Sequence, residues 1–117
     1  MDRQVITVAY EGRITEAGER EIMRWHQDGS ASPLDPRLDL ANKSPSGFAW
    51  GYGGSGPAQL ALAILADQLG DDERALRLYQ DFKGAVIAKL DHDAGWRLAA
   101  ADVRAAVAAI KAEDARA

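Results

Sequence analysis

The sequence predicts an α+β fold, in which a small antiparallel N-terminal sheet packs on a buried central helix plus two further helices. Three observations support this class: residues 4–10 are rich in β-branched side chains, residues 57–66 are almost entirely apolar, and residues 72–113 are mostly amphipathic at helical spacing. With 117 residues, 47% of them hydrophobic, the chain can bury one core. We expect a single domain over residues 1–117, with residues 1–26 mainly strand, 27–56 a long loop and glycine-rich turn, and 57–113 helical.

Several strand segments are expected at the N-terminus. The first covers residues 4–10, after which Glu11-Gly12 suits a turn and residues 13–15 a returning strand. Residues 19–26 fit both helical spacing and strand alternation. We favour a strand, because Gly18 precedes the segment and Asp28-Gly29 closes it as a hairpin turn would.

The segment of residues 27–47 is expected to be a long irregular loop, since prolines and glycines are spread through it. Loops of this length inside a compact domain are often functional or mobile. His26, immediately before it, is interpreted as a strand-end or surface histidine without an obvious partner.

The central helix is predicted over about residues 57–69. Pro57 suits the first helical position, Gly56 or Ser55 would be the N-cap, and Gly70 would end the helix. Only Gln59 is polar between Pro57 and Ala66, which is typical of a helix buried on all sides.

Two more helices are expected, over about residues 72–90 and 101–113. Asp71 and Asp72 favour the start of the first of these, and Asp102 would cap the other. Gly84 should weaken the 72–90 helix by about 1 kcal/mol relative to alanine. Residues 96–98, between the two helices, are either a short strand or an anchor.

Composition excludes several classes of function. The absence of cysteine removes disulfides, thiolate metal sites and cysteine nucleophiles, and a net charge of −4 argues against a nucleic-acid binder that relies on a basic field. Two histidines and no paired-carboxylate motif leave few groups for acid–base chemistry, so neither an enzyme nor a cofactor is expected. No apolar run reaches membrane-spanning length, and residues 1–5 do not resemble a signal peptide, so we expect a cytoplasmic protein.

The glycine-rich segment before the central helix is the predicted binding site. Its glycines can adopt positive φ, and backbone N–H groups at a helix N-terminus form a nest that suits an anion. In an extended chain the two aromatic rings would share one side and form a platform. The alternative, that the segment is only a tight turn with both rings buried, stays open. The expected binding residues are Trp50, Tyr52, Gly53, Gly54, Ser55, Gly56 and Gln59.

Known nucleotide-binding and catalytic motifs match this segment poorly. Residues 51–56 match the G-x-G-x-x-G dinucleotide fingerprint, but a proline-rich loop precedes them in place of a strand. No Gly-Lys-Ser/Thr of a phosphate loop follows, and Pro57 stands where a nucleophile elbow needs glycine. Residues 91–93, Asp-His-Asp, offer too few oxygen ligands for a hard cation, so no metal site is expected there.

Basic residues also gather on the 72–90 helix. Arg74, Arg77, Lys83 and Lys89 are interleaved with acidic residues, which is typical of a solvated helix face with weak ion pairs. A nucleic-acid-binding stripe is the poorer interpretation because the chain is acidic overall.

Residues 47–65, GFAWGYGGSGPAQLALAIL, and residues 74–83, RALRLYQDFK, resemble an uncharacterised family of small proteins from phages, plasmids and bacterial genomes. Residues 36–45 and 96–98 fit as well, whereas Gly84 stands where a larger side chain is expected. The resemblance implies a mobile-element context and supplies no catalytic residue.

These observations favour a non-enzymatic protein-binding factor of a phage or mobile element, a candidate counter-defence inhibitor of a CRISPR effector or another nuclease. Its expected partner is a host protein, such as a nucleic-acid-processing defence complex, met through the long loop and an acidic face. Direct contact with nucleic acid or membrane is not expected. Two alternatives stay open: a small-anion or nucleotide-binding module built on the glycine-rich turn, and a structural subunit of an assembly.

Overall fold

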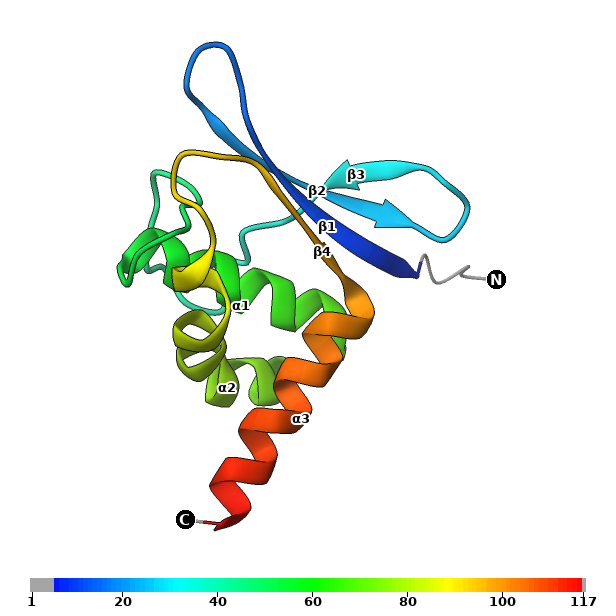
Figure 1. Cartoon of the computed structure of the whole chain (residues 1–117), viewed down its shortest axis with the longest axis vertical. Coiled ribbons are helices and arrows are strands. Elements are labelled where there is room, and N and C mark those ends of the chain that lie inside the picture. Colours follow the sequence, from blue (N-terminus) through cyan, green and yellow to red (C-terminus); the bar gives the residue numbers. More distant parts are fainter. Residues whose placement is uncertain (1–5, 117) are drawn as a thin grey trace.

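The structure is a computed structural model that describes the backbone of residues 6–116 and the side chains of residues 6–113. It confirms the α+β class: one four-stranded antiparallel sheet in the order β3-β2-β1-β4 packs against three helices, which lie together on one side of it (Figure 1). The elements are β1 (Thr7–Ile14), β2 (Arg20–His26), β3 (Ala31–Pro33), α1 (Ser55–Leu69), α2 (Asp72–Ala85), the 3₁₀ turn η1 (Ile87–Lys89), β4 (Trp96–Ala99) and α3 (Ala100–Arg116).

The predicted turn at Glu11-Gly12 is wrong, because β1 runs through it to Ile14. Gly12 instead makes room for the Trp96 indole of β4, which a Cβ atom at this position would strike. The chain reverses over residues 15–19, where the Thr15 N–H donates to the Glu19 carbonyl at 2.8 Å. The strand predicted over residues 19–26 is confirmed as β2. Residues 4 and 5 of the strand predicted over residues 4–10 lie outside the described residues.

The core lies around α1. All residues from Gly56 to Ala66 are buried, which confirms the predicted buried central helix. The helix begins at Ser55, two residues earlier than expected, with Gly54 as an extended N-cap, and Gly70 ends it in the left-handed conformation as predicted. No helix among the described residues is long and apolar enough to cross a membrane.

The second and third helices differ from expectation at their ends. α2 stops at Ala85 rather than near residue 90, because Val86 leaves helical geometry and Ile87 turns fully into the core. α3 follows β4 directly at Ala100, so Asp102 lies in its first turn and is not its cap. There its negative charge still interacts favourably with the positive N-terminal end of the helix dipole.

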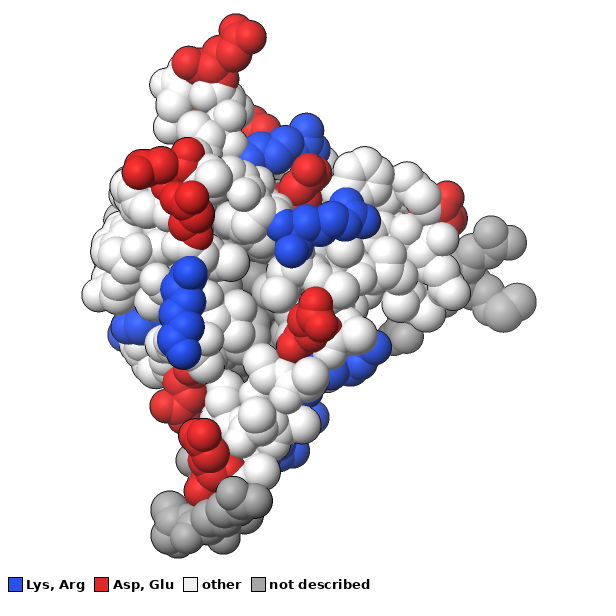
Figure 2. Space-filling view, viewed as in Figure 1, with Lys and Arg blue, Asp and Glu red and all other residues white. Residues whose placement is uncertain are grey.

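Charge is mixed over the surface. Acidic and basic side chains are interspersed across the face shown in Figure 2, with no uniformly acidic region on it. This distribution agrees with the modest net charge of −4.

Candidate functional site

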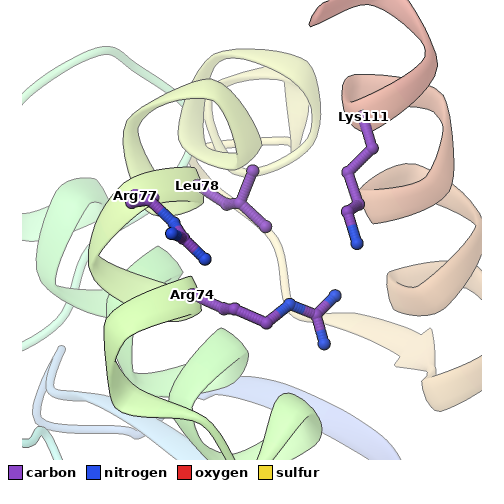
Figure 3. Close-up of a pocket in the computed structure, with 4 residues that line it drawn as sticks. All are labelled: Arg74, Arg77, Leu78 and Lys111. Carbon is purple, nitrogen blue, oxygen red and sulfur yellow. The ribbon is translucent and has the colours of Figure 1, made fainter. Parts of the chain in front are cut away.

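Three cavities lined by described residues bear on the search for a site. One of about 600 Å³ lies between α2 and α3 and is lined by Arg74, Arg77, Leu78 and Lys111 (Figure 3). The others, of about 280 and 250 Å³, lie at the loop beside α1 and at the start of β2. None of the three is lined by the predicted binding residues of the glycine-rich turn.

Trp50 of the glycine-rich turn is fully buried. Its indole N–H donates to the carbonyls of Asp91 and Ala94, both at 3.0 Å, and its ring meets Trp96 edge-on at 5.6 Å between centroids. The Arg20 guanidinium stacks 4.5 Å from the Trp50 ring centroid. Trp50 thus holds the turn, β2 and the loop before β4 together, and its ring offers no surface to a ligand.

Tyr52 points elsewhere. Its side chain is 46% exposed and packs beside His92. Gly51, between the two aromatics, has φ +85°, which breaks the alternation of an extended chain. The prediction of a paired aromatic platform is therefore wrong: one ring is in the core and the other is on the surface.

Close packing explains three glycines of the turn. A Cβ atom at Gly51 would lie 2.5 Å from the His92 Cα, one at Gly54 would lie 2.5 Å from the Tyr52 ring, and one at Gly56 would lie 2.7 Å from the Ala49 Cβ. Gly53 has open space around it. Gly53 and Ser55 are exposed, while Gly56 is buried. This packing supports the interpretation of the segment as a tight turn, but that interpretation expected both rings to be buried and only the Trp50 ring is.

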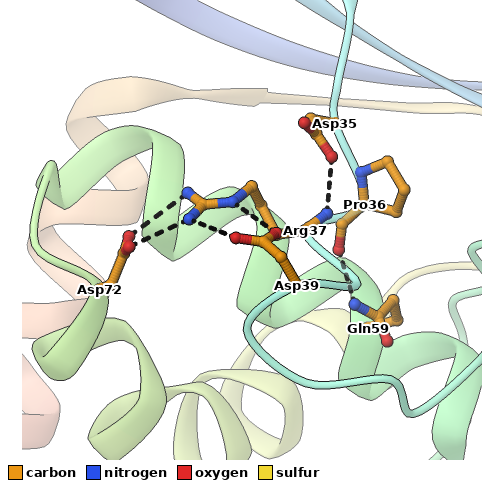
Figure 4. Close-up of polar contacts among 6 residues, drawn as sticks. All are labelled: Asp35, Pro36, Arg37, Asp39, Gln59 and Asp72. Carbon is orange, nitrogen blue, oxygen red and sulfur yellow. Dashed lines mark hydrogen bonds and ion pairs between the residues drawn. The ribbon is translucent and has the colours of Figure 1, made fainter.

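Gln59 is fully buried in α1, and its amide holds the long loop. The side-chain oxygen accepts from the backbone N–H groups of Lys43 at 2.8 Å and Ser44 at 3.2 Å. The side-chain nitrogen donates to the Pro36 carbonyl at 2.6 Å (Figure 4). In this arrangement the amide is engaged by the protein itself, between two ends of one loop.

Arg37 joins the same loop to α2. Its guanidinium binds Asp39 at 3.1 Å and Asp72 at 3.0 Å (Figure 4). The hydrogen bonds from Arg37 lower the pKa of the Asp39 carboxyl. The backbone of Arg37 has φ +55°, a strained value for a residue with a side chain, and the two ion pairs help to hold it there.

A polar network connects the sheet with α1. The Tyr10 hydroxyl donates to Asp67 at 2.6 Å, and Arg24 binds the other oxygen of that carboxylate at 2.6 Å. Arg24 also donates to the Ser32 hydroxyl at 3.1 Å, which lies 2.7 Å from the Nε2 atom of His26. His26 is therefore a buried strand-end residue, not a surface one. The alternation along β2 indicates this burial, because it places His26 on the same face of the strand as Ile22 and Arg24.

The network does not amount to a catalytic triad. The Nδ1 atom of His26 has no hydrogen-bond partner among the described residues, whereas a base that activates serine is oriented by a third group. Burial, and then the bond to Asp67, raise the pKa of the Tyr10 hydroxyl, so it stays protonated. Within the described residues, no three acidic or histidine side chains are grouped to hold a metal ion.

The helix-free side of the sheet carries a different set of side chains. Because Arg24 contacts α1, its neighbours in β2 point to the opposite side. There the Trp25 indole N–H donates to Glu11 at 3.1 Å, and the Arg97 guanidinium lies 5.6 Å from the Trp25 ring centroid. Register and alternation place Met23 and Arg13 on the same side. We call this surface the open face; its residues are Glu11, Arg13, Met23, Trp25 and Arg97.

The open face is not predicted from the sequence. The alternation along β2 is a signal for it, because it places Met23 and Trp25 on the face opposite Ile22 and Arg24. Fold and surface together define a small α+β protein with its helices on one side of the sheet (Figure 1) and the open face, with the partly exposed Trp25, on the other.

A sequence profile of the family of unknown function DUF6166 matches residues 10–109. The chain belongs to that family, which confirms the resemblance to an uncharacterised family. No curated protein and no solved structure matches the chain.

Proposed function

We propose that the protein is a non-enzymatic protein-binding factor and that the open face is the surface it presents to its partner. The observation that carries this proposal is Trp25: a half-buried tryptophan, held from two sides, on the face of the sheet opposite the three helices (Figure 1). Tryptophan and arginine are the residues most enriched among those that dominate binding energy at protein interfaces.

The contacts around Trp25 prepare it for binding. Glu11 fixes the indole N–H and Arg97 covers part of the ring, so little side-chain freedom remains to be lost on association. Met23, beside it on β2, is a flexible apolar side chain that adapts to different partner shapes. Together they offer an apolar centre with a charged rim, the usual anatomy of a protein interface.

The charges on the open face have both signs. Arg13 lies 3.4 Å from Glu11, and Arg97 is exposed. Such a rim orients a partner more than it adds affinity, and it offers no strong field for nucleic acid. The proposal therefore replaces the expected acidic face with a mixed one.

The biological setting of the proposal comes from the sequence resemblance: a phage or mobile element acting in the cytoplasm of a bacterial host, with a counter-defence target such as a CRISPR effector or another nuclease. Small size and a poor catalytic inventory support an inhibitor over an enzyme.

The test is an affinity pull-down of the tagged protein from host lysate, read by mass spectrometry, followed by titration of the captured partner. Trp25→Ala should weaken binding by about 30-fold, which corresponds to about 2 kcal/mol. The matched control is Tyr52→Ala, which removes an exposed aromatic ring from the glycine-rich turn instead. Circular dichroism confirms that both variants are folded.

The two variants separate the candidate surfaces. Loss of the partner with Trp25→Ala alone supports the open face, whereas loss with Tyr52→Ala alone returns the site to the glycine-rich turn. A partner that both variants retain overturns the proposal. The remaining alternatives have their own readouts: a rise in melting temperature with phosphate that Gly54→Val abolishes for an anion nest, and a discrete oligomer in light scattering for a structural subunit.

A further inference from the structure

The cavity between α2 and α3 lies apart from the open face and the glycine-rich turn. Arg74 and Arg77 reach it from adjacent turns of α2, and Lys111 reaches it from α3. In Figure 3 the Arg74 guanidinium and the Lys111 amine point into the space between the two helices, with Leu78 beside them. We call this site, formed by Arg74, Arg77, Leu78 and Lys111, the basic cleft.

The three cations of the basic cleft have no acidic partner among the side chains of residues 6–113. The ion pairs found among the described side chains use Arg13, Arg24, Arg37 and His92 instead. The expectation of weak pairs along α2 therefore does not hold for Arg74 and Arg77 there. Like charges directed into one cavity repel one another, and a bound anion removes that cost.

We propose that the basic cleft binds a small organic phosphate. Arginine presents a planar fork of donors that fits phosphate oxygens, and lysine adds a point charge from the opposite wall. The volume of about 600 Å³ is that of a site for a small molecule. Leu78 is buried and gives the cleft an apolar surface against which the organic part of the ligand packs.

A small ligand fits the cleft better than a nucleic acid does. Three cations would neutralise only a few phosphates, and the chain carries a net charge of −4. The basic side chains beyond the cleft on this part of the chain, Lys83 and Lys89, do not line it.

The proposal is tested by isothermal titration calorimetry with three probes: inorganic phosphate, ATP and a 20-nucleotide single-stranded DNA. ATP should bind saturably and more tightly than inorganic phosphate, since it adds both charge and an organic body. The double variant Arg74→Gln/Lys111→Gln should weaken ATP binding by at least about 10-fold, because it removes charge from both walls of the cleft.

The control is the double variant Lys83→Gln/Lys89→Gln, which changes the net charge by the same amount on and just after α2 but outside the cleft. Its affinity for ATP should match that of the wild type within about twofold. Equal losses of ATP affinity in both double variants would show that the effect depends only on net charge, and would overturn the proposal. So would the lack of saturable ATP binding, or tighter binding of the DNA than of ATP.

Discussion

Gln59 offers the most direct test of how the long loop is held on the core. The substitution Gln59→Met keeps an unbranched side chain of similar length inside α1, so it removes hydrogen bonds without opening a large cavity. Three backbone groups lose their partner: the N–H groups of Lys43 and Ser44, and the carbonyl of Pro36.

The magnitude follows from the burial of these groups. Ser44 is 8% exposed, so its N–H loses its bond without access to water, at a cost of about 1–3 kcal/mol. Lys43 is exposed and Pro36 is half-buried, so water can replace part of what they lose, at about 0.5–1 kcal/mol each. The free energy of unfolding should fall by about 3 kcal/mol.

Urea denaturation followed by circular dichroism measures this loss. The control is Gln27→Met, an exposed position whose change should stay within about 0.5 kcal/mol. A loss below about 1 kcal/mol for Gln59→Met, with an unchanged slope, would refute the view that the amide holds the loop.

A second variant tests the same hypothesis through the pH dependence of the free energy of unfolding. Gln59→Glu keeps the acceptor oxygens but brings a buried carboxylate against the Pro36 carbonyl, which raises the pKa of the new carboxyl group. A raised folded-state pKa means that stability is present below the unfolded value of about 4.3 and is lost as pH rises above it. The variant should therefore lie closer to the wild type at pH 4 than at pH 7, and a gap that does not change with pH would contradict this reasoning.

Three further predictions concern the fold. The raised pKa of Tyr10 means that its contribution to the free energy of unfolding is present below about pH 10 and is lost above it. Above that pH the wild type should lose up to about 1.4 kcal/mol per pH unit relative to Tyr10→Phe. Stability curves of the two proteins that stay parallel with pH would contradict this. Gly84→Ala should raise the free energy of unfolding by about 0.5–1 kcal/mol, because a Cβ atom there meets nothing within 4 Å, and a lower urea midpoint would oppose this. Arg37→Gly should be about 1 kcal/mol more stable than Arg37→Ala in the same assay, since both lose the ion pairs but only glycine accepts φ +55° freely; equal stabilities would show that no strain is stored there.

Local signals in the sequence predicted the elements whose causes are themselves local. Pro57, the apolar run after it and Gly70 are enough to place α1, because helix ends and buried faces depend on neighbouring residues. Gly18 before residues 19–26 and Asp28-Gly29 after them likewise favour a strand there, and this strand is β2.

Features that depend on distant residues could not be predicted in this way. The local sequence predicts a turn at Gly12, but glycine is needed there because of the Trp96 indole, far along the chain. Trp25 lies beside Arg97 only because β4 pairs with β1, and Lys111 lines the same cavity as Arg74 only because α3 packs against α2. The composition of the glycine-rich turn predicts a binding site, yet contacts with Ala49, Tyr52 and His92 explain three of its glycines.

The position of β4 in the sheet also sets an order of events during synthesis. During synthesis β1 leaves the ribosome long before β4, because the strand that completes its second edge begins only at Trp96. Until then the nascent chain displays an unpaired strand edge, to which another chain can add. Chains interrupted before residue 96 would keep that edge permanently, so premature stops in this protein should produce aggregates rather than a smaller folded product.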